Sequence, residues 1–431
     1  MTELTQVVIR RTKRLGGGVS APPSKAYTHR TVVAALLSKG SSRISTPLIS
    51  DDTQATIRVA KAFGARIRMR NDCCVITGVE VPRTPTRRLD CGESGSTFRF
   101  MIPIAALAAG SSTFVLRSSI KKRPIRPLLD SLKHLGVESS ILPDKRWSCV
   151  RIAGGGIKGG KTEIRGDITS QFVSGLLFAC PKAKKDTEIV VNTNLGSRSY
   201  VQMTIEVLGK HDIRVFASPD LTYLEIPSGQ DYKPCNYHVS GDFSAAAFLM
   251  AAAAITSSKV RVKNLNCSSI DGNRAIIEIL KEMGSKIRVQ RDSAEIKGQQ
   301  LEAIDIDATN IPDLVPAIAA VSCYSSGTSK IYNAKRLRYK ESDRLSSLYS
   351  ELKKMGARIT KNRNGLSIKG PCPMHGANVD PHNDHRIAMS CTIAALGASG
   401  ETTIQNSGCI KKSYPSFFDD LGSLGGKIVG R

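Results

Sequence analysis

The sequence predicts an α/β (α+β) fold made of six β/α units, three in each of two similar domains. Three observations lead to this prediction. The chain of 431 residues is long enough for two or three domains. One helix–turn–strand pattern recurs at a constant interval, and its helices are apolar on nearly all sides. Hydrophobic residues make up 41% and charged residues 23%, a globular composition that excludes a disordered or collagen-like chain.

The recurring pattern has a polar or glycine-rich start, an apolar helix, a small polar turn and a β-branched strand. It occurs in residues 24–45, 92–116, 167–191, 241–262, 312–331 and 383–404. The turns fall near residues 40, 110, 183, 257, 327 and 400, so neighbouring turns are 70–74 residues apart. Simple alternation of helices and strands does not require so constant an interval, and we interpret it as internal repetition.

A second helix follows in each unit and usually ends on a glycine before a strand. Glycine at this position predicts a left-handed helix C-cap, and the alternation after it predicts a strand. The third copy, around residues 200–213, has a looser pattern. The five clear copies are residues 63–67, 135–139, 283–287, 355–359 and 424–428.

The first helix of each unit should be buried, because it is apolar nearly all round, as in residues 245–254. Its polar residues gather at the N-terminal end, where exposed N–H groups and the helix dipole attract anions. Ordinary N-capping explains the Ser, Thr, Asp and Asn residues there, but it does not explain Lys25, Arg30, Arg99 and Arg386. We therefore hypothesise that the six helix starts converge on one anion-binding cleft between the domains.

The chain carries 62 Lys and Arg against 37 Asp and Glu, a formal net charge of +25. Such a charge is typical of polyanionic partners or of small anionic ligands. The basic clusters at residues 10–14, 121–126, 182–185 and 335–340 are short and scattered, and aromatic residues do not interleave with them. This argues against nucleic acid as the main partner. Solvated surface is the simplest account of most of the lysines.

Neither a membrane span nor a secretory signal is predicted, because the longest apolar runs are far shorter than about 18–20 residues. We expect a cytoplasmic protein that does not bind membranes. Eleven cysteines without a CxxC motif indicate reduced and mostly buried thiols.

Several motifs have an ordinary structural explanation. Residues 155–162, GGIKGGKT, formally match a phosphate-binding loop, but no helix follows, so we interpret them as a strand connection. His382 with His385, and Cys372 with His375, lack the second pair that a tetrahedral metal site needs, and no metal is expected. Residues 335–344, KRLRYKESDR, fit either a solvated helix face or a functional cluster. Arg386 at a helix start opposes the dipole and calls for a nearby anion.

Ten segments, in their order along the chain, resemble those of the enolpyruvyl transferases, in particular the branch that uses shikimate 3-phosphate. The resemblance covers essentially the whole chain and implies two domains of three βαβαββ units each, with the active site in the interdomain cleft. The expected domains are residues 25–236, and residues 1–24 with 237–431, joined by crossings near residues 20–24 and 230–235. The segments are PPSKAYTHR (22–30), CGESGSTFR (91–99), KKRPI (121–125), TSQF (169–172), SRSY (197–200), GDFSAAAF (241–248), IPDL (311–314), RYKESDR (338–344), NDHRIAM (383–389) and CIKKSYP (409–415).

The resemblance implies that the enolpyruvyl group of phosphoenolpyruvate is transferred to the 5-hydroxyl of shikimate 3-phosphate, with release of phosphate. This reaction belongs to the shikimate pathway, which leads to chorismate and the aromatic amino acids, and it uses no metal and no organic cofactor. Both substrates are anionic, which gives the basic residues a role. The expected partners are these two small molecules, without nucleic acid, and the expected protein is a monomer.

The resemblance also implies roles for individual residues. Asp313 should be the base that takes the hydroxyl proton, and Glu341 the acid that serves the methylene group, with Lys25 and His385 beside it. Shikimate 3-phosphate should be held by Lys25, Ala26, Arg30, Thr169, Ser170, Gln171, Ser197, Tyr200, Asp313, Arg336 and Lys340. Phosphoenolpyruvate should be held by Lys25, Gly95, Ser96, Arg123, Gln171, Arg344, Arg386 and Lys412.

The chain departs from the family pattern at three of these places. Ala26 stands where the family usually has Ser, Glu93 replaces a common Asn, and Arg336 occupies a position that is often Asn. We hypothesise that Arg336 compensates for the hydroxyl that Ala26 lacks. Two alternatives stay open. The branch that uses UDP-N-acetylglucosamine usually has a Cys in the loop corresponding to residues 117–123, where this chain has none. A basic nucleic-acid-binding repeat protein would show strongly salt-dependent binding.

Overall fold

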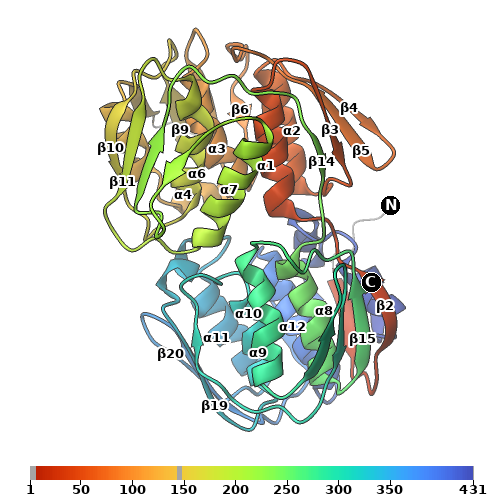
Figure 1. Ribbon diagram of the computed structural model, residues 1–431. Helices are drawn as coiled ribbons and strands as arrows, with labels where there is room; N and C mark the ends of the chain where they lie inside the picture. Colours follow the sequence, from red (N-terminus) through yellow and green to blue (C-terminus); the bar gives the residue numbers. More distant parts are fainter. Residues whose placement is uncertain (1–5, 143–147, 431) are drawn as a thin grey trace. The chain divides into compact units, whose positions relative to one another are not determined.

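The computed structural model describes residues 6–142 and 148–430 (Figure 1). The chain forms two compact units. We call Pro23–Val239 the central unit, and we call the residues up to Pro22 together with those from Ser240 onwards the terminal unit.

The first two repeats of the central unit contain most of its helices. Their elements are α1 (Lys25–Leu36), β3 (Ser41–Ser45), α2 (Asp51–Ala62), β4 (Arg66–Arg70), β5 (Cys73–Thr77), β6 (Leu89–Asp90), α3 (Gly95–Ala105), β7 (Ser112–Leu116), α4 (Ser118–Lys122), α5 (Arg126–His134), β8 (Ser139–Leu142) and β9 (Ser148–Ile152). The third repeat and the last strand are β10 (Gly160–Ile164), α6 (Gln171–Ala179), the 3₁₀ turn η1 (Cys180–Lys182), β11 (Thr187–Val191), α7 (Arg198–Lys210), β12 (Phe216–Ala217), β13 (Tyr223–Ile226) and β14 (Asn236–His238).

The terminal unit begins with two strands from the start of the chain. Its elements are β1 (Gln6–Arg10), β2 (Gly16–Ser20), α8 (Phe243–Ile255), β15 (Lys259–Lys263), η2 (Gly272–Ala275), α9 (Ile276–Glu282), β16 (Lys286–Val289), β17 (Ala294–Lys297), β18 (Ile306–Asp307), α10 (Val315–Ser322), β19 (Gly327–Tyr332), η3 (Lys335–Tyr339), α11 (Arg344–Lys354), β20 (Ile359–Lys361), β21 (Leu366–Gly370), β22 (Asn378–Val379), α12 (His385–Gly397), β23 (Glu401–Gln405), η4 (Ser407–Lys412), α13 (Phe417–Ser423) and β24 (Ile428–Gly430).

The six four-stranded sheets of the described residues share one topology. Each has a parallel pair followed by two antiparallel neighbours. In β10-β11-β13-β12, for example, the parallel pair is connected by α6, and the hairpin follows α7. The predicted fold class, a repeated βαβαββ unit, is confirmed.

Two strands lie in a different unit from the helix that follows them. β2 directly precedes α1, but it pairs in parallel with β15 of the terminal unit, with Val19 opposite Val262. β14 precedes α8, but it pairs in parallel with β3 of the central unit, with Tyr237 opposite Ile44. The second crossing therefore follows Val239 and not residues 230–235, because β14 still completes a central sheet.

The second helices end largely as predicted. Gly64, Gly136, Gly284, Gly356 and Gly425 all have positive φ values, between 80° and 107°. In the third copy, which was looser in sequence, Asp212 takes this position with φ 63°. An aspartate tolerates the left-handed conformation better than most side chains, so the repeat keeps its geometry without its glycine.

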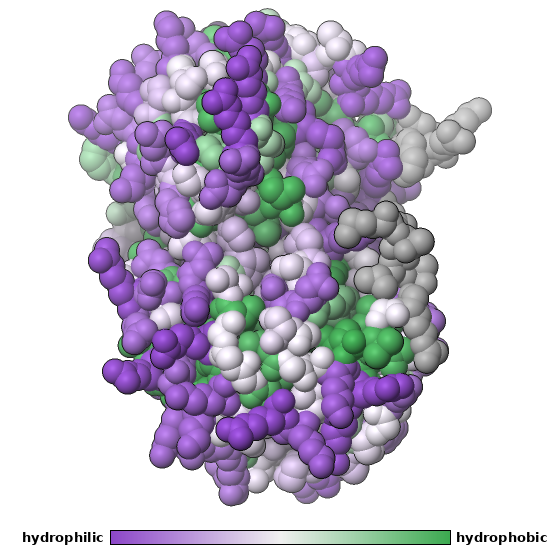
Figure 2. Space-filling model, turned by 90° about the vertical axis from the view of Figure 1, so that its right-hand side faces the viewer, coloured by the Kyte–Doolittle hydropathy of each residue, from purple (hydrophilic) through white to green (hydrophobic). Residues whose placement is uncertain are grey.

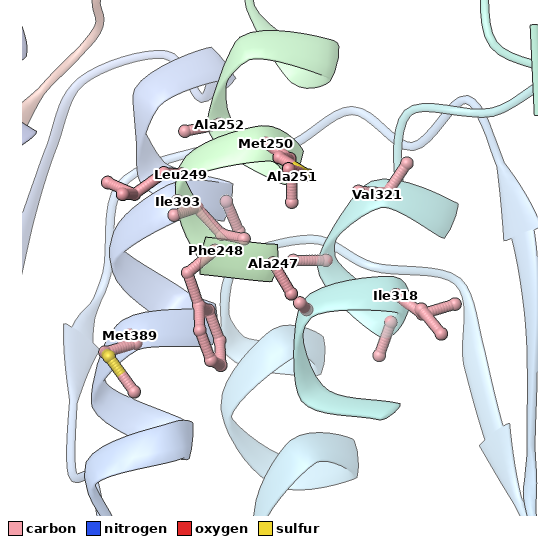
Figure 3. Close-up of a cluster of buried hydrophobic side chains, with 14 of the residues drawn as sticks. Ala247, Phe248, Leu249, Met250, Ala251, Ala252, Ile318, Val321, Met389 and Ile393 are labelled. Carbon is pink, nitrogen blue, oxygen red and sulfur yellow. The ribbon is translucent and has the colours of Figure 1, made fainter. Parts of the chain in front are cut away.

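The apolar first helices are buried, as predicted. In the terminal unit, α8, α10 and α12 pack together, and the close-up in Figure 3 shows apolar side chains from all three. Phe248 of α8, Ile318 and Val321 of α10, and Met389 and Ile393 of α12 are buried among them. Alanines make up much of α8, which lets the neighbouring helices approach closely.

The outer surface agrees with the high charge of the chain. On the face drawn in Figure 2, hydrophilic residues predominate and hydrophobic residues occur in small separate groups. No helix in residues 6–142 or 148–430 combines the length and the apolar character needed to cross a bilayer.

Candidate active site

In the central unit, the starts of four helices lie together. Lys25 Nζ, at the start of α1, is 3.0 Å from Asp52 Oδ2 at the start of α2. Thr97, in the first turn of α3, donates to the Asp52 carbonyl at 3.3 Å. Gln171, the first residue of α6, donates through Nε2 to Ser96 Oγ of α3 at 2.9 Å. The helix starts of this unit therefore converge, and they bring N–H groups and a lysine to one place.

Two arginines lie against the start of α3. Arg99 donates to Gln171 Oε1 at 2.6 Å. Arg123, which follows α4, is buried and donates to Ser119 Oγ at 2.9 Å. A β-carbon placed on Gly95 would lie 2.7 Å from Arg123 Nη1 and 3.2 Å from Arg99 Nη1. The absence of a side chain at Gly95 thus allows both guanidinium groups to approach the helix start.

Glu93 has a clear structural role despite its departure from the family pattern. Its carboxylate accepts hydrogen bonds from the hydroxyl and the backbone N–H of Ser119. Ser119 in turn accepts from Arg123. Glu93 therefore fixes the serine that orients Arg123.

Arg30 is buried in α1 and connects this helix to α7. It donates to Thr204 Oγ1 at 2.9 Å, to the Tyr200 carbonyl at 2.8 Å and to the Ala26 carbonyl at 2.9 Å. Ser197, directly before α7, has the left-handed φ of 58°. At the start of α6, Thr169 Oγ1 accepts from the Gln171 N–H at 3.3 Å, and the neighbouring Ser170 is buried.

In the terminal unit, Arg344 is the centre of a buried ion network. Its side chain is 1% exposed. Nε lies 2.8 Å from Asp384 Oδ2, Nη1 lies 3.0 Å from Asp313 Oδ1, and Nη2 lies 2.5 Å from Glu341 Oε2. Burial lowers the pKa of Arg344, but the three carboxylates outweigh it and raise the pKa above its ordinary value. This guanidinium is permanently charged.

Asp313 has three cations around one carboxylate oxygen. Besides Arg344, Lys340 Nζ lies 3.2 Å from Oδ1, and Arg386 Nε lies 3.6 Å from it. These cations stabilise the ionised carboxylate. Burial lowers the pKa of Lys340 to about 8, although the charge of Asp313 opposes the shift. Lys340, which lies beside Asp313, is therefore a cation that can lose its proton within reach of neutral pH.

The start of α12 meets the starts of α8 and α10. Asp384 caps α12 by accepting from the Arg386 N–H at 2.9 Å. Arg386 donates to Ser244 Oγ of α8 at 2.8 Å and to the Asp313 carbonyl at 2.9 Å. Asp313 is thus one anion beside Arg386. Lys412 donates to the Asn383 carbonyl at 2.6 Å, close to the same helix start.

The remaining predicted residues of the terminal unit lie near this network. His385, the first residue of α12, is buried, and its Nδ1 is 3.9 Å from Asp384 Oδ1. Arg336, in η3, donates to the Thr309 carbonyl at 2.9 Å. Arg336 and Ala26 belong to different units, and the hypothesis that one compensates for the other remains a prediction.

The structure thus groups the predicted residues into two sets. The central set contains Lys25, Ala26, Arg30, Gly95, Ser96, Arg123, Thr169, Ser170, Gln171, Ser197 and Tyr200. The terminal set contains Asp313, Arg336, Lys340, Glu341, Arg344, His385, Arg386 and Lys412. That both sets serve one active site remains a prediction.

Sequence reasoning did not predict several contacts that hold these sets in place. Asp52 pairs with Lys25, Arg99 with Gln171, Ser119 with Arg123, and Asp384 with Arg344. For Arg99 and Asp384 the signal was a charged residue at a helix start. No comparable signal pointed to Asp52 or Ser119. The partner of Asp52 is distant in the sequence, and the partner of Ser119 lies across an ordinary turn.

The structure resolves the motif that resembles a phosphate-binding loop. The segment that imitates a phosphate-binding loop enters strand β10 and not a helix, so the interpretation as a strand connection is confirmed. In the part of the chain that the structure describes, no group of three or more His, Cys, Asp and Glu side chains is placed to hold a metal ion.

A buried aspartate outside the predicted sets makes stability depend on pH. Asp271 is buried at the start of η2 and accepts from the Asn273 N–H at 2.9 Å and from its Nδ2 at 2.8 Å. Burial raises the pKa of Asp271 to about 7, and the charges of Asp242 and Asp313 add to the shift. The folded chain therefore keeps a proton that the unfolded chain releases between about pH 4 and pH 7.

Ionisation of Asp271 thus opposes folding, and its cost grows as pH rises through this interval and levels off above about 7. We expect Asp271→Asn to leave the free energy of unfolding nearly unchanged at pH 4. At pH 8 the variant should be more stable than the parent by ~2–4 kcal/mol. Urea titrations followed by far-ultraviolet circular dichroism at both pH values measure the difference, and an equal effect at both would contradict it.

Comparisons with known proteins agree with the fold. The family model for EPSP synthase (3-phosphoshikimate 1-carboxyvinyltransferase) matches residues 9–421. A protein of Methanocella arvoryzae named 3-phosphoshikimate 1-carboxyvinyltransferase is 43% identical over 96% of this chain and 97% of its own length. One of the same name from Methanocaldococcus jannaschii is 40% identical over 98% of this chain and 99% of its own.

A solved structure is also similar. EPSP synthase from Acinetobacter baumannii superposes with a TM-score of 0.81 at 26% identity, over 98% of this chain and 99% of that one. The repeated βαβαββ architecture, the helix starts rich in cations and these full-length matches lead to one conclusion. The chain belongs to the EPSP synthase (3-phosphoshikimate 1-carboxyvinyltransferase) family.

Proposed function

We propose that this chain transfers the enolpyruvyl group of phosphoenolpyruvate to the 5-hydroxyl of shikimate 3-phosphate and releases phosphate. The observation that supports this most is the cluster around Asp313, in which Lys340, Arg344 and Arg386 contact one carboxylate at the meeting point of helix starts. A carboxylate held by cations suits a reaction in which a proton leaves a hydroxyl beside phosphate groups.

The proposed chemistry is addition followed by elimination. As the 5-hydroxyl oxygen attacks C2 of phosphoenolpyruvate, Asp313 takes the hydroxyl proton and Glu341 gives a proton to the C3 methylene. In the second step Glu341 takes a proton back from the resulting methyl group, the enol double bond forms again, and phosphate leaves C2 with the proton that Asp313 held. Glu341 Oε2 lies 2.5 Å from Arg344 Nη2, and this ion pair fixes the orientation of the carboxyl group for this role.

The remaining predicted residues bind the two anions in this proposal. The guanidinium group of arginine forms two parallel hydrogen bonds with phosphate or carboxylate, which suits Arg123, Arg344 and Arg386 as phosphoenolpyruvate ligands. Lys412 would add a single positive charge. The N–H groups at Gly95 and Ser96 open α3 and add a helix-dipole site for phosphate. Lys25 and Gln171 would contact both substrates. The other residues of the central set would contact shikimate 3-phosphate, together with Asp313, Arg336 and Lys340 of the terminal set.

The direct test is release of inorganic phosphate in a coupled assay with each acceptor in turn. We expect saturable release only when phosphoenolpyruvate and shikimate 3-phosphate are both present. Release with UDP-N-acetylglucosamine in place of shikimate 3-phosphate would assign the chain to the other branch. Tight binding to DNA or RNA that weakens steeply with salt, without phosphate release, would favour the nucleic-acid alternative.

Gly95 offers a sharp test of the phosphoenolpyruvate site. In Gly95→Ala the new methyl group would overlap Arg123 Nη1 at 2.7 Å, so this guanidinium must move. We expect the KM for phosphoenolpyruvate to rise about tenfold or more, while the Kd for shikimate 3-phosphate changes little. Steady-state kinetics and calorimetric titration measure the two effects.

The matched control is Gly209→Ala. Gly209 lies in α7, and a β-carbon there would meet no atom within 4 Å. Its kinetic constants should equal those of the parent. An unchanged KM for phosphoenolpyruvate in Gly95→Ala would contradict the proposed position of this substrate.

Lys340 should impose an alkaline limit on activity. Since the pKa of Lys340 is lowered to about 8, the free enzyme loses this cation as pH rises past that value. We expect kcat/KM for shikimate 3-phosphate to fall above about pH 8, because kcat/KM reports the ionisation of the free enzyme. Lys340→Arg stays charged and should move the limit upward. An unmoved alkaline limit would exclude Lys340 as its source.

We also propose that the protein acts as a monomer in the cytoplasm. Sedimentation at several protein concentrations tests the first statement, and localisation of the tagged chain tests the second.

A further inference from the structure

Two cysteines of the terminal unit lie next to each other, although they are far apart in sequence. Cys323 is the C-cap of α10, and Cys372 follows β21. The Cys372 N–H donates to the Cys323 carbonyl at 2.7 Å, which places the two residues side by side. A direct backbone hydrogen bond keeps the Cα atoms within the ~7 Å that a disulfide can span.

The surroundings of the two sulfur atoms differ. Cys372 is half-buried, and its sulfur accepts the Arg358 N–H at 3.3 Å. Arg358 also donates to the Pro371 carbonyl at 2.5 Å, which holds its charge beside Cys372. Cys323 is fully buried and its thiol contacts the Ala319 carbonyl at 3.3 Å. Cys372 is therefore partly exposed, whereas Cys323 is closed to solvent.

These surroundings separate the reactivities of the two thiols. Hydrogen bonding from Cys323 and the proximity of Arg358 lower the pKa of Cys372 to about 6, although burial opposes the shift. The pKa of Cys323 is raised well above its ordinary value by the hydrogen bond to Cys372 and by burial. At neutral pH the accessible sulfur is therefore mainly the thiolate, which is the nucleophilic form.

We propose that Cys372 and Cys323 form a dithiol site that a peroxide oxidises to a reversible disulfide, with Cys372 as the attacking sulfur. The Cys372 thiolate attacks the O–O bond of hydrogen peroxide, which gives a sulfenic acid and a hydroxide ion that takes up a proton. The Cys323 sulfur, as it loses its proton, then attacks the sulfenic sulfur, and the hydroxyl group leaves as water. Two thiols and one peroxide thus become one disulfide and two waters, and a dithiol reductant reverses the change.

The buried Cys323 makes the oxidation of Cys372 reversible, which a single thiol cannot do. A sulfenic acid without a neighbouring thiol is oxidised further to sulfinic acid, which is not reversible by ordinary reductants. The site lies at the C-terminal end of α10, whereas Asp313 precedes its N-terminal end, so the proposed oxidation does not use the residues assigned to catalysis. The disulfide also closes a chain segment of about 50 residues and should raise the Tm by about 5 °C.

The experiment uses the full chain, reduced and then exposed to a small excess of hydrogen peroxide, followed by peptide mapping in a mass spectrometer. We expect a linked pair of peptides that contain Cys323 and Cys372, lighter by two hydrogen atoms and separated again by a dithiol. With iodoacetamide at pH 7, Cys372 should react more than about tenfold faster than Cys235. Cys235 is the matched control, because it is also half-buried but its pKa is raised by burial.

Two variants sharpen the test. Cys372→Ser should abolish the linked peptides, and Cys323→Ser should accumulate sulfinic acid at position 372. A link from Cys323 to the buried Cys391, sulfinic acid at Cys372 in the parent protein, or equal alkylation of Cys372 and Cys235 would each overturn the proposal. Since the link is mapped in the parent protein, the test does not depend on the variants being stable.

Discussion

Asp313→Asn should lower kcat by about 10²–10⁴-fold and leave the binding of shikimate 3-phosphate nearly intact. The amide has almost the same shape as the carboxylate but cannot take up the hydroxyl proton, and a positioned base contributes about this factor. Arg344 keeps Glu341 and Asp384 as partners, so the network around the site persists. Single-turnover phosphate release measures the rate, and calorimetric titration with shikimate 3-phosphate measures the binding.

The control is Asp305→Asn in the same unit. Asp305 is exposed, accepts from the Lys330 N–H and touches none of the residues assigned to catalysis. Its activity should equal that of the parent. If Asp313→Asn keeps more than about one tenth of the parental kcat, the proton must have another acceptor, and Asp313 loses the role of base.

Asp384→Ala should cause the largest loss of stability among the predicted variants. The variant leaves Arg344, which is 1% exposed, without the carboxylate that pairs with its Nε and removes the N-cap of α12. Removal of one partner from a buried ion pair costs about 3–5 kcal/mol, because the other charge stays buried. Urea unfolding followed by circular dichroism should show the terminal unit unfolding at a lower urea concentration.

Two further variants are needed for comparison. One separates the charge of Asp384 from its role as N-cap, and the other removes an ion pair that is exposed. In Asp384→Asn the side chain still accepts from the Arg386 N–H. The free energy of unfolding should therefore fall less than in Asp384→Ala, by about 1 kcal/mol. Glu401→Ala removes an ion pair with Arg10 whose side chains are 53% and 50% exposed, and it should change the free energy of unfolding by less than about 1 kcal/mol. Equal losses in Asp384→Ala and Glu401→Ala would show that burial of the Arg344 network does not matter.

The repeat architecture could be predicted from the sequence, because each repeat is determined locally. Apolar helices, polar turns and glycine caps lie within a few residues of one another, and Asp212 shows that the geometry survives when one glycine is replaced. The position of the second crossing could not be predicted in this way. It depends on β14 pairing with β3, and three extended residues give no local signal for their partner.

The candidate site was predictable to the extent that its residues lie in recognisable motifs. Arg344, Arg386 and Asp313 belong to such motifs, but their mutual contacts join helix starts far apart in the chain. Asp52 beside Lys25 is an unremarkable acid at a helix start. Cys323 and Cys372 have no shared motif, since their proximity arises from α10 and β21 packing in one repeat.

The chain begins in the terminal unit, forms the central unit and then returns, and this path has a consequence for biosynthesis. A ribosome makes the chain from its first residue, and domains usually fold as they emerge. The central unit has all its strands once residue 238 has emerged. β1, in contrast, pairs with β23 and β24, which are made long after the central unit. β1 must therefore wait for its partners while the central unit can already fold.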